Sequence, residues 1–321
     1  MELLLPIAGI LGGFIALVWG ADRFVMGAAA TARNLGVSPL VVGLTIVGFG
    51  TSAPEMLVSS MAAYRGAANL SIGNAVGSNI ANIALVLGLA GLVSPLQVNR
   101  KVVSRELPVL LLVMIGASAL LWDGTLGFVD GIALLTGLGV MIAWVVREGM
   151  KERELPEDIA SELPDAMSTP VALFWVLLGL GILLGSSELL VWGAKTIAIH
   201  LGVSERIIGL TVVAFGTSLP ELAATLVAAR RGEHDIAVGN IIGSNMFNTL
   251  GVLGLPGVIR PGECEASVIA LDLPVMVGVT ALLWVVTRLF RPYLRLGRFR
   301  GALLLSTYVG YLVALAFLRH A

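Results

Sequence analysis

The chain has 321 residues, of which 57% are hydrophobic and only 13% are charged, with a formal net charge of −1. A soluble domain of this length carries roughly twice that share of charged residues, so the composition excludes an ordinary soluble protein. Several apolar runs exceed the ~20 residues that a helix needs to cross a bilayer. The sequence therefore predicts an all-α polytopic membrane protein, with the lipid bilayer as its surroundings and no nucleic acid among its partners.

Apolar runs separated by polar turns predict ten transmembrane helices. The first lacks a basic leader and a clear cleavage site, so we expect a retained helix and not a signal peptide. In chain order the first five spans are 3–32, 40–63, 70–93, 105–122 and 126–146. The last five are 169–199, 206–229, 236–259, 267–287 and 301–319. We therefore divide the chain into a five-helix unit at 1–147, a linker at 148–168 and a second five-helix unit at 169–321.

The twenty Lys and Arg residues are distributed unevenly between the two sides that these spans define. Fourteen fall on the side of the polar 147–170 segment and four on the other side, while Arg23 and Lys195 fall within spans. Lys and Arg concentrate in cytoplasmic loops of membrane proteins. The distribution predicts that both termini lie outside and the 147–170 loop lies in the cytoplasm, as for a multi-pass protein of a bacterial inner (plasma) membrane.

The two halves contain an internal repeat. Residues 35–89 align with 201–255 without a gap, at a constant offset of 166, and about half of the aligned residues are identical. Such self-similarity predicts a duplicated unit. Because five spans is an odd number, the second unit would enter the membrane from the opposite side. Inverted repeats of this kind are typical of secondary transporters, whose substrate sites lie near the midplane between the repeats.

Each repeat places one carboxylate inside an apolar run. FGTSAPE at 49–55 ends in Glu55, and FGTSLPE at 215–221 ends in Glu221. A charged group within a span is costly and usually marks a functional pathway. The proline before each glutamate should break or kink its helix and free backbone carbonyls for a ligand.

Hydroxyl and amide side chains accompany both carboxylates at helical spacing. Thr51 and Ser52 precede Glu55 by four and three residues, so one helix face can carry all three. Two further segments, GNAVGSNIAN at 73–82 and GNIIGSNMFN at 239–248, each place a Ser and an Asn four residues apart. The candidate side-chain ligands are Thr51, Ser52, Glu55, Ser78, Asn82, Thr217, Ser218, Glu221, Ser244 and Asn248.

These oxygen donors suit a hard cation such as Ca²⁺, Mg²⁺ or an alkali ion, and not zinc or copper. Ca²⁺ accepts about six to eight flexibly arranged oxygens, whereas Mg²⁺ tends to keep its waters. Two carboxylates bring a charge near −2, which one Ca²⁺, two or three Na⁺ or two protons would cancel. Because an uncancelled charge is costly in a membrane, the empty site should change sides reluctantly, which favours exchange over leak.

The paired motifs resemble those of the calcium/cation antiporter superfamily, in particular its sodium/calcium exchangers. Those proteins carry a GTS-x-P-E/D segment followed by a G-S-N segment in each of two α-repeats, here at about 35–90 and 201–256. The resemblance implies that the Thr and Glu of each first segment bind Ca²⁺ and Na⁺ transiently, without a cofactor, and that the first and sixth spans slide against the other eight. It also implies roles for two carbonyls, two sodium-site serines and a central amide pair: Gly48 and Ala214, Ser78 and Ser244, Asn82 and Asn248.

Two features depart from some members of this superfamily. Several relatives carry Asp where this chain has Asn248, and the missing charge argues against potassium dependence. The short central loop leaves no room for the large cytoplasmic calcium-sensing domains of animal exchangers.

We therefore expect a secondary antiporter that exchanges Ca²⁺ for Na⁺ by alternating access, and not an enzyme. An H⁺- or K⁺-coupled antiporter and a passive cation channel are the alternatives that the residues leave open. A serine protease using Ser52 is disfavoured, since no His or Lys lies at the motif's depth on a neighbouring span to act as base. The chain has no G-x-x-x-x-G-K-[ST] loop, which argues against an ATP-driven pump. Glu106 and Asp272, each followed by Leu-Pro, are interpreted as helix caps.

Overall fold

The computed structural model describes residues 3–151, 167–201, 214–289 and 295–318, and most of these residues are helical. The α-helices of the first half are α1 (Leu4–Leu35), α2 (Pro39–Val42), α3 (Gly48–Thr51), α4 (Ala53–Tyr64), α5 (Ala68–Ile80), α6 (Gly88–Val93), α7 (Leu107–Leu120) and α8 (Phe128–Lys151). Those of the second half are α10 (Thr169–His200), α12 (Ala214–Thr217), α13 (Leu219–Arg230), α14 (His234–Phe247), α15 (Gly254–Ile259), α16 (Leu273–Leu289) and α17 (Arg298–Leu318).

Short π-helical segments interrupt several of these helices. They are η1 (Gly43–Val47), η2 (Ala81–Leu87), η3 (Val102–Glu106), η6 (Asn248–Val252) and η7 (Val268–Asp272), and η4 (Leu121–Asp123) is a 3₁₀ turn. The segments η3 and η7 are separated by the same offset of 166 that relates the two sequence repeats. Since π-helical turns are rare and often occur at functional sites, their recurrence shows that the halves share local geometry as well as sequence.

Seven helical segments within the described residues are long and apolar enough to cross a membrane, and a bent pair formed by Pro39–Thr51 and Ala53–Tyr64 would make an eighth. The prediction of a polytopic helical membrane protein is therefore confirmed. The count of ten stays a prediction, because the predicted span at 206–229 begins outside the described residues. Most of the 148–168 linker also lies outside them.

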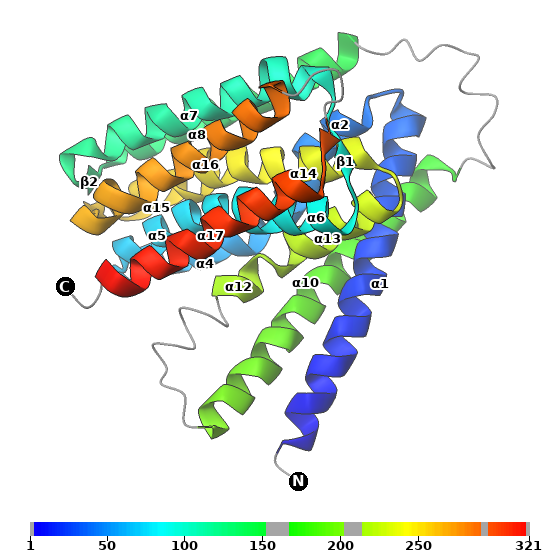
Figure 1. Ribbon diagram of the computed structural model, residues 1–321, viewed down its shortest axis with the longest axis horizontal. Coiled ribbons are helices and arrows are strands. Elements are labelled where there is room, and N and C mark those ends of the chain that lie inside the picture. Colours follow the sequence, from blue (N-terminus) through cyan, green and yellow to red (C-terminus); the bar gives the residue numbers. More distant parts are fainter. Residues whose placement is uncertain (1–2, 152–166, 202–213, 290–294, 319–321) are drawn as a thin grey trace.

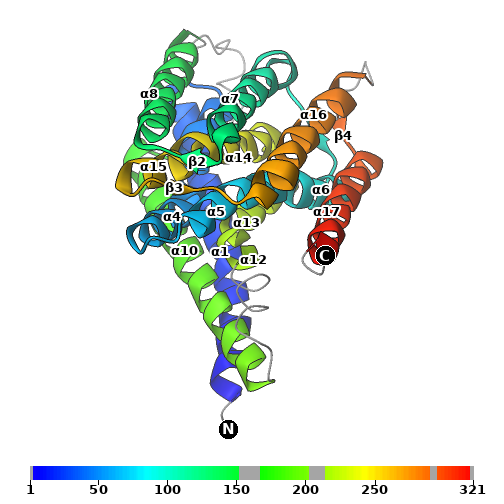
Figure 2. The same ribbon diagram turned by 90° about the vertical axis from the view of Figure 1, so that its left-hand side faces the viewer.

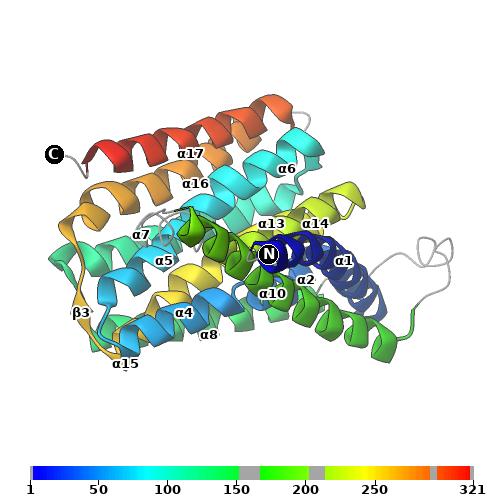
Figure 3. The same cartoon turned by 90° about the horizontal axis from the view of Figure 1, so that it is seen from below.

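Helices α1 and α10 lie side by side and project from the rest of the molecule (Figures 1 and 2). Glycines allow this close approach: a methyl group on Gly179 would lie 2.5 Å from the Phe24 nitrogen, and one on Gly27 would lie 2.7 Å from the Ala172 carbonyl oxygen. Small residues serve the same purpose in other membrane bundles. Seen from below, α16 and α17 lie on one side of the body and α4 and α8 on the other (Figure 3).

Two short pairs of antiparallel strands link loops of the first half to loops of the second half. Strand β1 (Leu96–Gln97) pairs with β4 (Arg295–Leu296), and β2 (Thr125–Leu126) pairs with β3 (Gly262–Glu263). The two halves therefore interlock and share one core. The apolar window of His234–Ile259 is entirely buried, against 28% for the windows of α1 and α10, so α14 lies at the centre.

Candidate functional site

Both FGTS-x-PE segments interrupt their helices at the serine. Ser52 has φ −82° and ψ 0°, and Ser218 has φ −89° and ψ 2°, a sparsely populated region of backbone space. Pro54 and Pro220 lie in the first turn of the helix that follows, where a missing N–H needs no partner. In the first motif the two helical pieces meet at 44°. The predicted interruption is present at each motif, two residues before the proline.

The two glutamates lie in the first turns of α4 and α13 and are completely buried. Glu55 and Glu221 are close enough to interact electrostatically, and Glu221 lies beside Thr51 and Ser52. None of the four carboxylate oxygens has hydrogen-bond geometry to any partner in the described part of the chain. Two buried carboxylates without partners are expensive, so this arrangement suits a positively charged ligand.

Thr51 joins the two repeats. Its hydroxyl donates to Asn240 Oδ1 at 3.0 Å and lies 3.1 Å from the Ser244 hydroxyl, both on α14. The carbonyl oxygen of Gly48 accepts from Ser244 at 3.3 Å and from the Ser52 amide at 3.1 Å. The structure thus brings three predicted ligands, Gly48, Thr51 and Ser244, into one cluster between η1–α3 and α14.

One member of the predicted amide pair, Asn82, lies in a buried hydrogen-bond network, whereas the other, Asn248, does not join it in the described part of the chain. Asn82 donates to Asn245 Oδ1 at 3.0 Å, and Asn245 donates to the Asn79 carbonyl at 3.2 Å. Asn79 in turn donates to Thr249 Oγ1 at 2.9 Å. Asn248 is fully buried at the first position of η6. Among the described residues, several polar atoms of the predicted set have no hydrogen-bond partner: Ser52 Oγ, Asn82 Oδ1, Ser218 Oγ, and Asn248 Nδ2 and Oδ1.

The remaining predicted residues lie around this centre. Ser78 is buried on α5, and Thr217 is partly buried at the end of α12. Ala214 begins α12, whose Gly216 carbonyl accepts from Ser187 of α10 at 2.8 Å. No cluster of three His, Cys, Asp or Glu side chains is found in the ranges that the structure describes. A cation here would therefore take most of its ligands from hydroxyl, amide and carbonyl groups.

Four asparagines that the sequence analysis did not select make hydrogen bonds next to the candidate ligands. Asn74 donates to the Glu55 carbonyl at 3.2 Å and to Ser59 Oγ at 2.9 Å. Asn240 makes the matching contacts with the Glu221 carbonyl at 3.4 Å and with Thr225 Oγ1 at 3.0 Å. Asn79 and Asn245 form the network described above. All four occur in the repeated letters GN and GSN, which was the only signal available.

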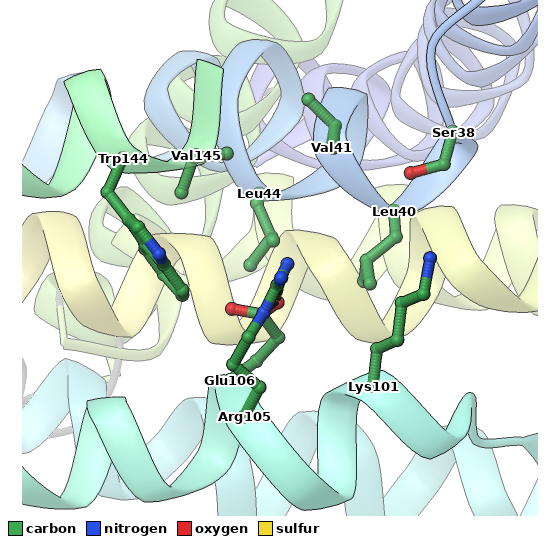
Figure 4. A pocket seen from close by; sticks show the side chains of 9 residues that line it. All are labelled: Ser38, Leu40, Val41, Leu44, Lys101, Arg105, Glu106, Trp144 and Val145. Atoms are coloured by element: carbon green, nitrogen blue, oxygen red, sulfur yellow. Dashed lines mark hydrogen bonds and ion pairs between the residues drawn. The ribbon is translucent and has the colours of Figure 1, made fainter. Parts of the chain in front are cut away.

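A separate pocket lies between η3, α8 and the Ser38–Leu44 segment, where Arg105 and Glu106 face Trp144 (Figure 4). Arg105 pairs with Glu106 at 2.9 Å and with Glu148 at 2.8 Å, and its guanidinium lies 5.1 Å from the Trp144 ring centre. Glu106 makes no side-chain capping bond to α7, so its interpretation as a cap is wrong. Its carboxylate is instead held in the ion pair with Arg105.

Comparison with known proteins agrees with these features. The family model described as "Sodium/calcium exchanger protein" matches residues 5–147 and again residues 171–317. The chain is 44% identical to the putative antiporter CaxA of Alkalimonas amylolytica, covering 94% of this chain and 96% of that protein. It is 40% identical to the inner membrane protein YrbG of Escherichia coli (strain K12), covering 98% of both. A structure of the sodium-calcium exchanger NCX_Mj, soaked with zero Na⁺ and Ca²⁺, superposes with a TM-score of 0.85 at 36% identity, over 98% of this chain and 99% of that one.

The fold and the buried oxygen-lined centre define a multi-pass helical membrane protein of the cation-antiporter class. The double family match covers most of the chain, and the chain belongs to the sodium/calcium exchanger protein family.

Proposed function

We propose that the protein is a secondary active antiporter that exchanges Ca²⁺ for Na⁺ at one site shared by Glu55 and Glu221. The observation that carries the proposal is the burial of these two carboxylates without partners in the described part of the chain, one from each repeat. Hydroxyl and amide groups surround them, and among the twelve predicted ligands only these two can carry a charge. A bound cation of charge +2, such as Ca²⁺, would cancel the negative charge of the two carboxylates.

The site belongs, in this proposal, to ten transmembrane helices arranged as two inverted five-helix repeats. The family model matches the chain twice, at 5–147 and 171–317, which supports two units joined by a linker at 148–168. The recurrence of η3 and η7 at the repeat offset supports the same division. The distribution of Lys and Arg supports outside termini and a cytoplasmic linker.

Alternating access requires part of the structure to move past the site. We assign this motion to α1 and α10, the first and sixth predicted spans, which project from the body as a pair (Figure 1). Their outer faces are largely exposed, and small residues line their mutual contact. In the membrane these outer faces would meet lipid, so the pair can slide without exposing protein core to water.

The ion that drives the cycle can be determined in proteoliposomes. Ca²⁺ uptake is measured under an imposed Na⁺, K⁺ or pH gradient, each alone. We expect uptake only against Na⁺. Uptake driven by the pH or K⁺ gradient but not by Na⁺ would show that the driving ion is assigned wrongly. Ca²⁺ that equilibrates without any counter-ion would indicate a channel.

The residues can be tested in the same vesicles. Glu55→Gln and Glu221→Gln should each abolish Na⁺-driven Ca²⁺ flux, since each removes half of the charge that the ions must cancel. Glu188→Gln, which changes an exposed carboxylate on α10, should retain the flux and serves as the control. Full activity of both site variants, with normal membrane insertion, would contradict the proposed site.

A further inference from the structure

Asn240 is completely buried at the point where the two repeats meet. Its amide group contacts both halves of the site: Nδ2 donates to the Glu221 carbonyl at 3.4 Å and to Thr225 Oγ1 at 3.0 Å, while Oδ1 accepts from Thr51 at 3.0 Å. A carbonyl oxygen can only accept, so the Nδ2 end of the amide must face Glu221. The oxygen end is therefore directed at Thr51.

This orientation determines the direction of the Thr51 hydroxyl. The amide oxygen of Asn240 can only accept, and at 3.0 Å it is nearer to the Thr51 hydroxyl than the Gly48 carbonyl oxygen at 3.5 Å, so the single Thr51 proton is directed toward Asn240. The oxygen lone pairs of Thr51 then remain available, and a hydroxyl binds a cation through these lone pairs. Glu221 lies beside Thr51, and without Asn240 its carboxylate would be the strongest nearby acceptor for that proton. The Thr51 proton would then compete with the cation for Glu221.

We infer that Asn240 is a positioning residue of the cation site, which keeps the Thr51 proton away from Glu221 so that both oxygens face the ion. The inference rests on the proposed function, because it assigns a role within that same site. Its chemical target is a hard cation bound by a hydroxyl lone pair and a carboxylate.

The repeat supplies a matched control. Asn74 occupies the corresponding position in the first repeat and clamps its own broken helix through the Glu55 carbonyl and Ser59. Asn240 makes the same two contacts in the second repeat and adds the bond to Thr51. The clamping effect is therefore common to both residues, and the excess effect at Asn240 measures its action on Thr51.

The test is a double-mutant cycle on the half-saturating Ca²⁺ concentration for Na⁺-driven uptake. Asn240→Ala should raise this concentration about fivefold more than Asn74→Ala does, the usual net value of one hydrogen bond. Thr51→Val removes the oriented hydroxyl itself and should raise this concentration at least as much. In that background Asn240→Ala should add only the factor that Asn74→Ala gives, because only its clamping contacts remain to be lost. Equal shifts at Asn240 and Asn74 in the wild-type background, or an undiminished Asn240→Ala factor in the Thr51→Val background, would overturn the inference.

A milder variant covers the case in which Asn240→Ala does not fold. Thr225→Val keeps the shape of the side chain but removes one acceptor that orients Asn240. It should raise the half-saturating Ca²⁺ concentration about twofold more than Ser59→Ala, which removes the matching clamp contact in the first repeat. This excess should vanish in the Thr51→Val background. An excess that persists there would contradict the inference. Wild-type vesicles lacking Na⁺-driven uptake would refute the proposed function itself, whereas an active wild type with an undiminished Asn240→Ala factor in the Thr51→Val background refutes only the role of Asn240.

Discussion

Helices α5 and α14 carry the same GNxxGSNxxN pattern, yet they lie in different surroundings. The apolar window that contains α14 is entirely buried, against 72% for the window that contains α5. A methyl on Gly243 would lie 2.4 Å from the Leu44 carbonyl oxygen, and one on Gly239 would lie 2.8 Å from the Leu40 carbonyl oxygen. Equivalent methyls on Gly73 and Gly77 would meet no described atom within 4 Å.

The difference teaches that one sequence pattern serves two packing environments in a single molecule. On α14 the glycines are needed because backbone meets backbone. On α5 no contact in this structure requires them. Under the proposed motion, α1 and α10 slide past the body that contains both helices, so α5 and α14 keep their different surroundings throughout the cycle.

The largest expected effect is on the stability of the folded protein, when a glycine of α14 or of α5 is replaced by alanine. Gly243→Ala should destabilise the folded protein by about 1–3 kcal/mol or more, because the backbone at Leu44 must move. Gly77→Ala should leave stability unchanged or raise it by up to about 1 kcal/mol, since alanine favours helix. Thermal unfolding in detergent measures both. Equal destabilisation by the two variants would show that the surroundings of α5 and α14 do not differ.

Transport by the Gly77→Ala variant gives a second test of how the surroundings of α5 and α14 differ. Gly77→Ala should leave the rate of Ca²⁺ exchange unchanged, because the added methyl meets no described atom within 4 Å and α5 lies in the body that the proposed sliding of α1 and α10 leaves in place. Gly116→Ala, on α7 with no described atom within 4 Å of the added methyl, is the matched control and should leave the rate unchanged. Slower exchange by Gly77→Ala than by Gly116→Ala would show that α5 repacks during the cycle and that α1 and α10 do not move alone.

A smaller effect is expected where the halves meet at the surface. Asp22 of α1 pairs with Arg231, which follows α13, at 2.6 Å, and both side chains are 37% exposed. A half-exposed pair of this kind contributes less than about 1 kcal/mol, and salt screens it. Arg231→Gln should therefore lower the free energy of unfolding slightly at low ionic strength and not at all in 1 M salt. A loss that persists at high salt would point to a tighter contact than this ion pair.

The smallest effect concerns Cys264, which corresponds to Val98 in the first half at the repeat offset, both being 7% exposed. Cys264→Val should thus be neutral for stability. Burial raises the pKa of the Cys264 thiol to about 11, and the nearby Asp272 and Glu265 carboxylates add to the shift. Since only the thiolate reacts, alkylation of the native protein should be slow at pH 7.5 and rise about tenfold per pH unit. Rapid labelling at neutral pH, without denaturant, would contradict this environment.

Much of the fold could be predicted from the sequence, because membrane spans depend on local composition. The runs at 105–122 and 126–146 correspond to the helical segments Val102–Asp123 and Phe128–Gly149. The break at each motif also followed from one residue type, proline. The π-helical turns and the pairing of β1 with β4 did not follow, because both depend on contacts between segments far apart in the chain.

The site could be predicted only as a set of oxygen donors. Glu55 and Glu221 stood out because carboxylates are rare inside spans. Asn240 did not, because its proposed role depends on a hydrogen bond with Thr51, which lies 189 positions away in the chain. Spacing within one helix indicates which residues share a face, whereas partners across a repeat interface require the tertiary structure.

The central claim is that the two repeats form one cation site, and calorimetric Ca²⁺ titration of the purified protein in Na⁺-free buffer tests it most directly. We predict one Ca²⁺ bound per chain, and complete loss of that binding in Glu55→Gln and in Glu221→Gln alike. Two ions per chain, with one retained in each variant, would mean that each repeat binds its own cation and would contradict a shared site.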